Sequence, residues 1–220
     1  MLLIRLLNNH RTSQKTSVMI RVIIIFFLIT ASLAVKGQEF TSAFHLGWNI
    51  FVPFSDKDFT GSTSTAGIRI GYSKFVNDKF GFGFEAGYST LDDYVPPTTY
   101  LHEGGAITTD RYNYLYYFTL MANGQYYLSQ GKRFISYTSL GMGVAFSDYR
   151  IFYNVYQEGD DNAGFVIRPE IGTLFKVTEN SGFGLKAAVG FEYATNKSEY
   201  FETKNLSGLN FQIGIVLLNR

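Results

Sequence analysis

FGFGFEAGYSTL, residues 80–91, alternates bulky apolar residues with glycine over most of its length. One set of alternate positions holds Phe80, Phe82 and Phe84, whereas the other holds glycine and Glu85. A period of two residues is typical of a β-strand, in which successive side chains point to opposite faces of the sheet. The segment therefore predicts a strand with one bulky apolar face and one face of glycine and charge.

The same alternation recurs in eight segments of the chain. We expect strands over residues 40–54, 64–76, 80–91, 111–128, 133–149, 164–177, 182–195 and 207–219. Three connections are short turns, at 77–79, 129–132 and 178–181. The other four are long polar loops, at 55–63, 92–110, 150–163 and 196–206. Short turns on one rim and long loops on the other are typical of outer-membrane barrels, with the turns periplasmic and the loops extracellular.

Glycine decides which face of these strands meets lipid. Twelve mid-strand glycines share the face opposite the apolar side chains: Gly47, Gly67, Gly71, Gly81, Gly83, Gly87, Gly141, Gly143, Gly172, Gly184, Gly190 and Gly214. A water-soluble sandwich would turn its apolar face inward and would have no reason to prefer glycine outside. The lumen of an eight-stranded barrel is only wide enough for side chains, so small residues fit there. We therefore expect an all-β, eight-stranded antiparallel up-and-down transmembrane β-barrel with its bulky side chains toward lipid.

The inward face also carries six charged residues, three of each sign. They are Arg69, Arg168, Lys186, Glu85, Glu170 and Glu192. Counting back from the turn at 178–181 places Arg168 near Glu192 on adjacent strands, and Arg69 lies diagonally near Glu85. Buried charges are stable only when they are paired and hydrogen-bonded, so we expect an ion-pair network inside the lumen. Pro169 cannot donate to a strand ladder, and we expect a β-bulge there.

Composition excludes several classes of function. The chain has no Cys, which removes disulfides, thiolate catalysis, Cys-based zinc sites and lipid attachment at Cys. Its formal net charge is +1, without the one-sided basic charge of a nucleic-acid surface. His45 is expected as a lumen residue rather than a ligand, and no His-x-Ser spacing places a general base beside a nucleophile. We therefore predict no catalytic residue, no cofactor and no metal site, and we expect that the protein is not an enzyme.

The N-terminal part has the features of a targeting segment. VIIIFFLITASLAV, residues 22–35, is uncharged and follows Arg21. It is too short for a transmembrane helix, but it suits the apolar region of a secretory signal, with small residues at the cleavage site. We expect residues 1–18 to be an upstream extension or a misassigned start, residues 19–37 to be a signal peptide, and residues 38–220 to be the outer-membrane β-barrel. An uncleaved membrane anchor is the alternative.

Taken together, these segments resemble the small eight-stranded outer-membrane β-barrels, the OmpA-transmembrane and OmpX-like group, and most of all the PorT-like barrels of Bacteroidota. The resemblance covers about residues 38–220. It rests on the Gly-x-Gly strand at 80–87, a similar strand at 181–185 and the closing strand at 212–217, which resembles the signal read by the barrel assembly machinery. It implies a location in the outer membrane of a Gram-negative bacterium, with periplasmic termini, and an ion-pair plug in the lumen.

Three functions are compatible with this sequence. The first is a structural or surface-interaction barrel with a plugged lumen and four extracellular loops. The second, implied by the PorT-like resemblance, is an accessory factor of a secretion or gliding system. The third is a narrow ion channel or a lipid A-modifying enzyme, an acyltransferase or deacylase. The expected partners are outer-membrane lipid or lipopolysaccharide, the barrel assembly machinery during insertion, and a protein bound through the extracellular loops, but no nucleic acid.

Overall fold

The computed structural model describes residues 40–55, 57–102, 105–153 and 156–220. The described residues form one compact unit. The predicted upstream extension (1–18) and signal peptide (19–37) lie outside the described residues, so both stay predictions.

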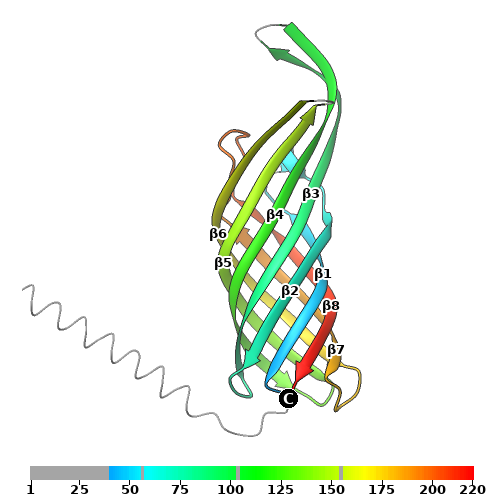
Figure 1. The fold of residues 1–220 in the computed structure, drawn as a ribbon, viewed down its shortest axis with the longest axis vertical. Coiled ribbons are helices and arrows are strands. Elements are labelled where there is room, and N and C mark those ends of the chain that lie inside the picture. Colours follow the sequence, from blue (N-terminus) through cyan, green and yellow to red (C-terminus); the bar gives the residue numbers. More distant parts are fainter. Residues whose placement is uncertain (1–39, 56, 103–104, 154–155) are drawn as a thin grey trace, which may run out of the picture. The chain divides into compact units, whose positions relative to one another are not determined.

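Eight β-strands pair in chain order and close into a barrel (Figure 1). They are β1 (Ser42–Pro53), β2 (Ser64–Phe75), β3 (Phe80–His102), β4 (Gly105–Gln130), β5 (Phe134–Tyr153), β6 (Tyr156–Lys176), β7 (Phe183–Ala194) and β8 (Leu206–Asn219). Every neighbouring pair is antiparallel, including β1 with β8, which closes the ring. The all-β class and the eight-stranded antiparallel barrel are therefore confirmed.

Four consecutive strands are much longer than the others. β3, β4, β5 and β6 have 20 to 26 residues, whereas β1, β2, β7 and β8 have 12 to 14. Figure 1 shows β3 and β4 continuing as a hairpin beyond the rest of the barrel. The prediction of long loops at residues 92–110 and 150–163 is therefore wrong, because both segments are mostly strand.

Cross-strand aromatic pairs explain why these segments are strands. The Tyr94 and Tyr112 rings have centroids 4.9 Å apart, and Tyr114 packs edge-on against Phe152 at 5.7 Å. Each such pair stabilises neighbouring strands by roughly 0.2–1 kcal/mol. The polar composition of these segments suggested loops, but antiparallel strands can be solvated, so polar composition alone does not end a strand.

Pro169 lies in regular pairing, so the predicted β-bulge there is wrong. Its partner in β5 is Leu140, and the pairs of β6 with β7 on either side of it keep the same register. In the ladder between β6 and β7, the positions of Arg168 and Pro169 are not paired. This gap accommodates the missing N–H of proline without an inserted residue. A register shift between β3 and β4 falls at the pair Pro96-Pro97.

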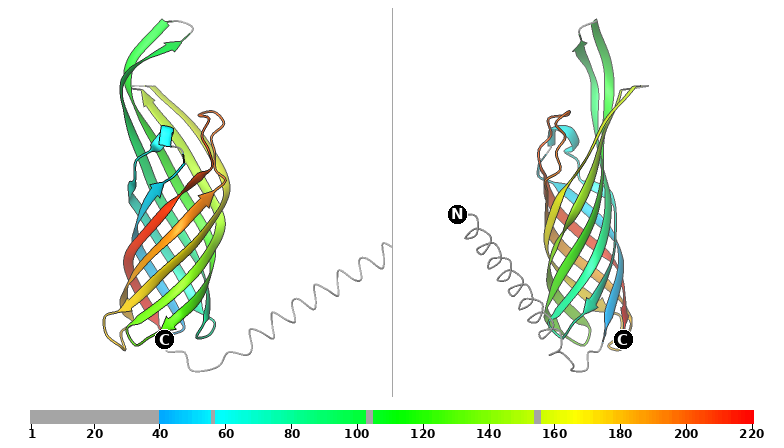
Figure 2. Two further views of the ribbon diagram at one scale, coloured as in Figure 1. Left: turned by 180° about the vertical axis from the view of Figure 1, so that it is seen from behind. Right: turned by 60° about the vertical axis from the view of Figure 1, so that its left-hand side comes forward.

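The two remaining long connections lie at one end of the barrel, which we call the loop rim. Residues 55–63 include the one-turn helix α2 (Lys57–Thr60), and residues 195–205 contain turns. The short turns and the C-terminal Arg220 lie at the opposite end, which we call the turn rim (Figure 2). In the described part of the chain, no helix has the length and apolar character needed to cross a membrane.

The bulky apolar side chains cover the outside of the barrel. Trp48, Phe84 and Ile213 are 50%, 64% and 61% exposed, and many similar residues surround them. Such an outer belt is the surface that a bilayer covers in outer-membrane barrels. On the inner face space is short: a Cβ on Gly83 would lie 2.8 Å from Ser73 Oγ. Glycine at this position therefore leaves room for the inward side chain of the neighbouring strand.

The inner side chains form three layers along the tube. Near the loop rim lies an apolar cluster that includes Phe51, Leu115 and Tyr149. Near the turn rim lies a second one, which includes Tyr127 and Val216. The buried charged residues lie between these two clusters. The barrel therefore has apolar layers on both sides of an ionic middle layer.

Candidate functional site

All six charged residues predicted to face the lumen are buried in the middle layer. We call them the lumen network: Arg69 of β2, Glu85 of β3, Arg168 and Glu170 of β6, and Lys186 and Glu192 of β7. Three are cations and three are carboxylates. The formal charge of the lumen network is therefore zero.

Glu85 lies at the centre of the lumen network. One of its carboxylate oxygens accepts hydrogen bonds from Arg69 Nη2, at 2.9 Å, and from Arg168 Nη2. The other oxygen lies 3.1 Å from His45 Nε2 and 3.8 Å from Lys186 Nζ. Four basic groups from four strands thus converge on one carboxylate. Removal of Glu85 would leave three carboxylate-binding cations, those of Arg69, Arg168 and Lys186, with only two carboxylates, Glu170 and Glu192.

Glu170 connects opposite walls of the tube. Arg69 Nη2, on β2, lies 2.6 Å from Glu170 Oε2, on β6. The Tyr137 hydroxyl donates to Glu170 Oε1 at 2.9 Å, and Lys186 Nζ lies 3.8 Å from the same oxygen. Because β2 and β6 are four strands apart in the ring of eight, this contact crosses the lumen.

Arg168 joins the third carboxylate to the network. Its Nη1 donates to Glu192 Oε2 at 2.8 Å, and Asn210 Nδ2 donates to the same oxygen at 3.0 Å. The structure thus brings together the pair Arg168 with Glu192, as well as the pair Arg69 with Glu85. The contacts across the tube were not predicted, because alternation indicates the face of a residue but not its partner on the opposite wall.

Little space remains around the lumen network. The two cavities beside it each have a volume of about 10 Å³. Roughly that volume is the minimum that accommodates one water molecule. The described side chains of the middle layer thus leave room there for single waters.

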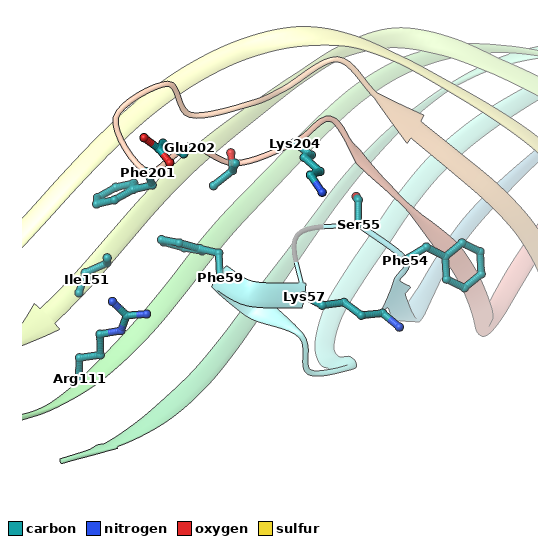
Figure 3. A pocket seen from close by; sticks show the side chains of 10 residues that line it. Phe54, Ser55, Lys57, Phe59, Arg111, Ile151, Phe201, Glu202 and Lys204 are labelled. Atoms are coloured by element: carbon teal, nitrogen blue, oxygen red, sulfur yellow. The ribbon is translucent and has the colours of Figure 1, made fainter. Parts of the chain in front are cut away.

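A separate cavity of about 600 Å³ opens at the loop rim, and we call it the mouth pocket (Figure 3). Its lining residues are Phe54, Ser55, Lys57, Phe59, Arg111, Ile151, Phe201, Glu202, Thr203 and Lys204. They come from Phe54 and the 55–63 connection that follows it, from β4 and β5, and from the 195–205 loop. Three of them are cations, and Glu202 is the single carboxylate among the described lining residues. The mouth pocket was not predicted, because two of its walls are loops without a periodic pattern.

Side-chain contacts hold the walls of the mouth pocket in place. Asn113 Nδ2 donates to the backbone oxygen of Phe59 at 2.8 Å, which fixes α2 to β4. The ring of Phe59 lies 5.2 Å from the rings of both Tyr149 and Phe201. These contacts join α2 to β5 and to the 195–205 loop.

The 195–205 loop is also fixed to β6. Ser198 Oγ donates to Asp160 at 2.6 Å, and the Tyr200 hydroxyl donates to Glu158 at 3.3 Å. The negative charge of Glu158 raises the pKa of Tyr200 above its ordinary value, so the hydroxyl keeps its proton. Glu202 has a φ of 53°, in the left-handed region that residues with a side chain rarely adopt. Such strained positions often occur at functional sites.

Histidine and metal ligands add little to either site. His45 Nε2 lies 3.1 Å from Glu85 and 3.2 Å from Lys186 Nζ, inside the lumen. Among the described residues, no group of three or more His, Cys, Asp or Glu side chains is arranged to hold a metal ion.

No protein-family model matches the chain, and no curated protein sequence matches it. Among solved structures, the barrel is similar to Ail, the attachment invasion locus protein of Yersinia pestis, with a TM-score of 0.51 at 11% sequence identity, covering 82% of this chain and 99% of that chain. Neisserial surface protein A matches at 16% identity with a TM-score of 0.46, covering 83% and 99%. The outer membrane protease OmpT of Escherichia coli matches at 9% identity with a TM-score of 0.48, covering 86% and 99%. By its likeness to Ail, the chain has the fold of an outer-membrane β-barrel.

Proposed function

We propose that the protein is an outer-membrane barrel that acts at the cell surface through its loop rim and whose lumen is closed to ions. The turn rim then faces the periplasm, and the long strands β3–β6 project outside the cell. The role is structural or one of surface interaction, rather than transport or catalysis.

The observation that carries this proposal is the length of β3–β6 beyond the closed ring. The last residue of β3 that pairs with β2 is Thr90, and the last residue of β6 that pairs with β7 is Val166. From Thr90, β3 continues to His102, which corresponds to about 40 Å of extended chain. A strand of about 9–11 residues already crosses a bilayer. We call the part of β3–β6 beyond the ring the extension, and anchoring alone does not require it.

The edges of the extension suit a surface that stays in solvent. Beyond the ring, β3 and β6 each have one edge without a strand partner among the described residues. Pro96-Pro97 interrupts the edge of β3, and Glu158, Asp160 and Asp161 place charge along β6. Proline and charge on edge strands oppose unwanted pairing with other chains. The extension can therefore remain exposed without aggregation.

The middle layer supports closure of the lumen. An ion that crossed it would have to displace several of the buried ion pairs around Glu85 and Glu170, because the cavities beside them hold about 10 Å³ each. We therefore expect purified protein in planar bilayers to give no conductance steps. Regular steps from the wild-type protein would contradict this part of the proposal.

Cysteine labelling tests the orientation, since the chain contains no native Cys. A membrane-impermeant maleimide should label Thr99→Cys, in the extension, on intact cells. Lys79→Cys, in a short turn, should react only after the outer membrane is permeabilised. The opposite pattern would contradict the surface role of the extension.

Shortening the hairpin tests the role itself. Replacement of residues 96–109 by a two-residue turn should reduce the attachment of cells to surfaces and to one another while the barrel is still inserted. Unchanged attachment with the shortened hairpin would contradict the proposal.

The same strains distinguish the alternative functions. An accessory factor of secretion would, on deletion, block export of secreted proteins while the membrane stays intact. A lipid A-modifying enzyme would change the mass spectrum of lipid A. We expect neither change.

A further inference from the structure

The outer face of the barrel carries a groove of about 480 Å³ where the extension leaves the ring, and we call it the interfacial groove. Its lining includes Phe118, Phe146 and Ala163 at one end and Asp148 and Asp161 at the other. We propose that the interfacial groove binds a membrane lipid whose headgroup carries a primary ammonium group. The inference goes beyond the proposed function, because it requires only that the apolar belt of the barrel lies in a bilayer.

Strand register shows how the interfacial groove is built. One row of paired residues crosses the outer face of the four neighbouring strands β3–β6 (Figure 1): Tyr88, Phe118, Phe146 and Ala163. The next row toward the loop rim lies two residues further along each strand: Thr90, Tyr116, Asp148 and Asp161. Two residues of a strand span roughly 7 Å. The apolar row and the two carboxylates are therefore close enough for one lipid molecule to contact both.

The interfacial groove lies at the edge of the apolar belt. The row on its turn-rim side is entirely apolar: Ala86, Leu120, Val144 and Phe165. The segment from Phe80, where β3 begins, to Tyr88 has nine residues, and about 9–11 residues of a tilted strand cross a bilayer. Tyrosine is also enriched at the level of the lipid headgroups. One end of the groove thus meets acyl chains, and the other end meets headgroups.

The apolar end suits an acyl chain. The rings of Phe118 and Phe146 are stacked, with centroids 6.3 Å apart, and both side chains are exposed on the outer face. Beside them β6 contributes only the methyl group of Ala163, whereas its next outward residue toward the turn rim is Phe165. Two rings beside a small residue form a depression, in which a lipid chain makes close van der Waals contacts.

The polar end carries more carboxylates than cations. Asp148 and Asp161 face each other directly across β5 and β6, and like charges in that position are destabilising. Arg150 Nε donates to Asp148 Oδ1 at 2.6 Å, and its side chain lies over Gly159 of the neighbouring strand. This hydrogen bond, with the charges of Asp148 and Asp161, raises the pKa of Arg150 above its ordinary value. Two carboxylates thus share one guanidinium, and a second cation would offset their remaining repulsion.

The chemistry of this end selects the headgroup. A primary ammonium group has three N–H donors, which can form charge-assisted hydrogen bonds with the two facing carboxylates. A headgroup that carries only a phosphate would be repelled by the remaining negative charge. A quaternary ammonium group has no N–H to donate. Arg150, beside the carboxylates, can bind the phosphate that precedes the ammonium group in an ethanolamine headgroup.

Lipid titration of the full chain tests the inference. The refolded protein in micelles would be titrated with phosphatidylethanolamine, phosphatidylglycerol and phosphatidylcholine of identical acyl chains, and native mass spectrometry would count the bound lipids. Phosphatidylethanolamine should bind about tenfold more tightly than phosphatidylglycerol, as expected for one charged hydrogen bond. Phosphatidylcholine should also bind more weakly than phosphatidylethanolamine.

Two variants test the two ends of the interfacial groove separately. Asp161→Asn keeps the size of the side chain but removes its charge, so it should weaken binding of phosphatidylethanolamine about tenfold without weakening that of phosphatidylglycerol. Phe146→Ala should weaken binding of both lipids alike. Asp92→Asn is the matched control, because Asp92 lies on the same outer face but does not line the groove. It should bind both lipids like the wild type.

Three results would overturn the inference. The first is equal affinity of the wild type for phosphatidylethanolamine and phosphatidylglycerol, or of the wild type and Asp161→Asn for phosphatidylethanolamine. The second is phosphatidylcholine bound as tightly as phosphatidylethanolamine, because binding would then not depend on N–H donors. The third is tighter binding of phosphatidylglycerol on addition of Mg²⁺, lost in Asp161→Asn, which would assign the carboxylates to a metal bridge. None of these results changes the labelling of Thr99→Cys, which tests the proposed function by itself.

Discussion

The lumen network and the mouth pocket are two clusters of charge in one tube, and they are built on opposite principles. In the lumen network three cations face three carboxylates, all buried and joined by contacts of 2.6 to 3.8 Å. The described lining of the mouth pocket also includes three cations, and two of them, Lys57 and Lys204, are exposed. Matched buried charges hold a structure together, whereas charges exposed at an opening contribute little to stability.

The largest effect is expected from removal of the central carboxylate of the lumen network. In Glu85→Ala the cations Arg69 and Arg168 lose the group that they share. Removal of one partner from a buried ion pair costs about 3–5 kcal/mol, so the free energy of unfolding should fall by about that amount. Urea unfolding in micelles, followed by Trp48 fluorescence, measures it.

Glu179→Ala is the control for this change. Glu179 lies at the turn rim, about half exposed and 3.7 Å from Lys132. Exposed ion pairs contribute about 0–1 kcal/mol. If Glu85→Ala destabilised the barrel no more than Glu179→Ala does, the lumen network would not stabilise the barrel.

A smaller effect on the free energy of unfolding is expected from alanine substitutions at two glycines of β5. They test whether steric fit also closes the middle of the barrel. In Gly143→Ala the new Cβ meets the backbone of β4, including Met121 Cα at 2.7 Å. In Gly141→Ala the nearest atom is the flexible Met121 Sδ at 3.4 Å. Overpacking costs about 1–3 kcal/mol, so Gly143→Ala should lower the free energy of unfolding by that much and Gly141→Ala by less. Equal effects of the two substitutions would indicate that the lumen has free space beside both glycines.

Arg111→Gln tests the mouth pocket in the same way. Because the mouth pocket lies at the open end of the barrel, this variant should change the free energy of unfolding by less than about 1 kcal/mol, mostly through the lost contact with the Tyr100 ring. The same urea titration measures it. A loss as large as that of Glu85→Ala would show that Arg111 is a structural residue, and the mouth pocket would no longer differ in kind from the lumen network.

Salt should produce the smallest change in stability. The Debye length falls from about 10 Å at 0.1 M salt to about 3 Å at 1 M, and buried pairs are screened much less than exposed charges. Raising NaCl over this range should leave the free energy of unfolding unchanged within about 0.5 kcal/mol. Strong salt dependence of unfolding would mean that water reaches the lumen network.

The inner face of the barrel could be predicted from the sequence because it obeys a period of two. That period, with the position of the turn at 178–181, was sufficient to place Arg168 beside Glu192. It could not place Arg69 against Glu170, since these residues meet across the tube from opposite strands. Pairing across a closed ring depends on the stagger of all eight strands, which no single segment contains.

The loop rim was harder to predict. Polar composition suggested loops at 92–110 and 150–163, but cross-strand rings continue the ladders there. The mouth pocket combines Lys57 and Lys204, from two separate loops, with Arg111 of β4. Only the folded chain brings these residues to one place.

The fold depends on which face of the sheet meets lipid, and Trp48, the single tryptophan of the chain, tests this directly. Its side chain is 50% exposed on the outer face of β1, between Ile68 of β2 and Ile213 of β8. In bilayers of lipids brominated on their acyl chains, the account predicts strong quenching of Trp48 fluorescence and little quenching by acrylamide in the water. Strong quenching by acrylamide, with no effect of the brominated lipids, would contradict it.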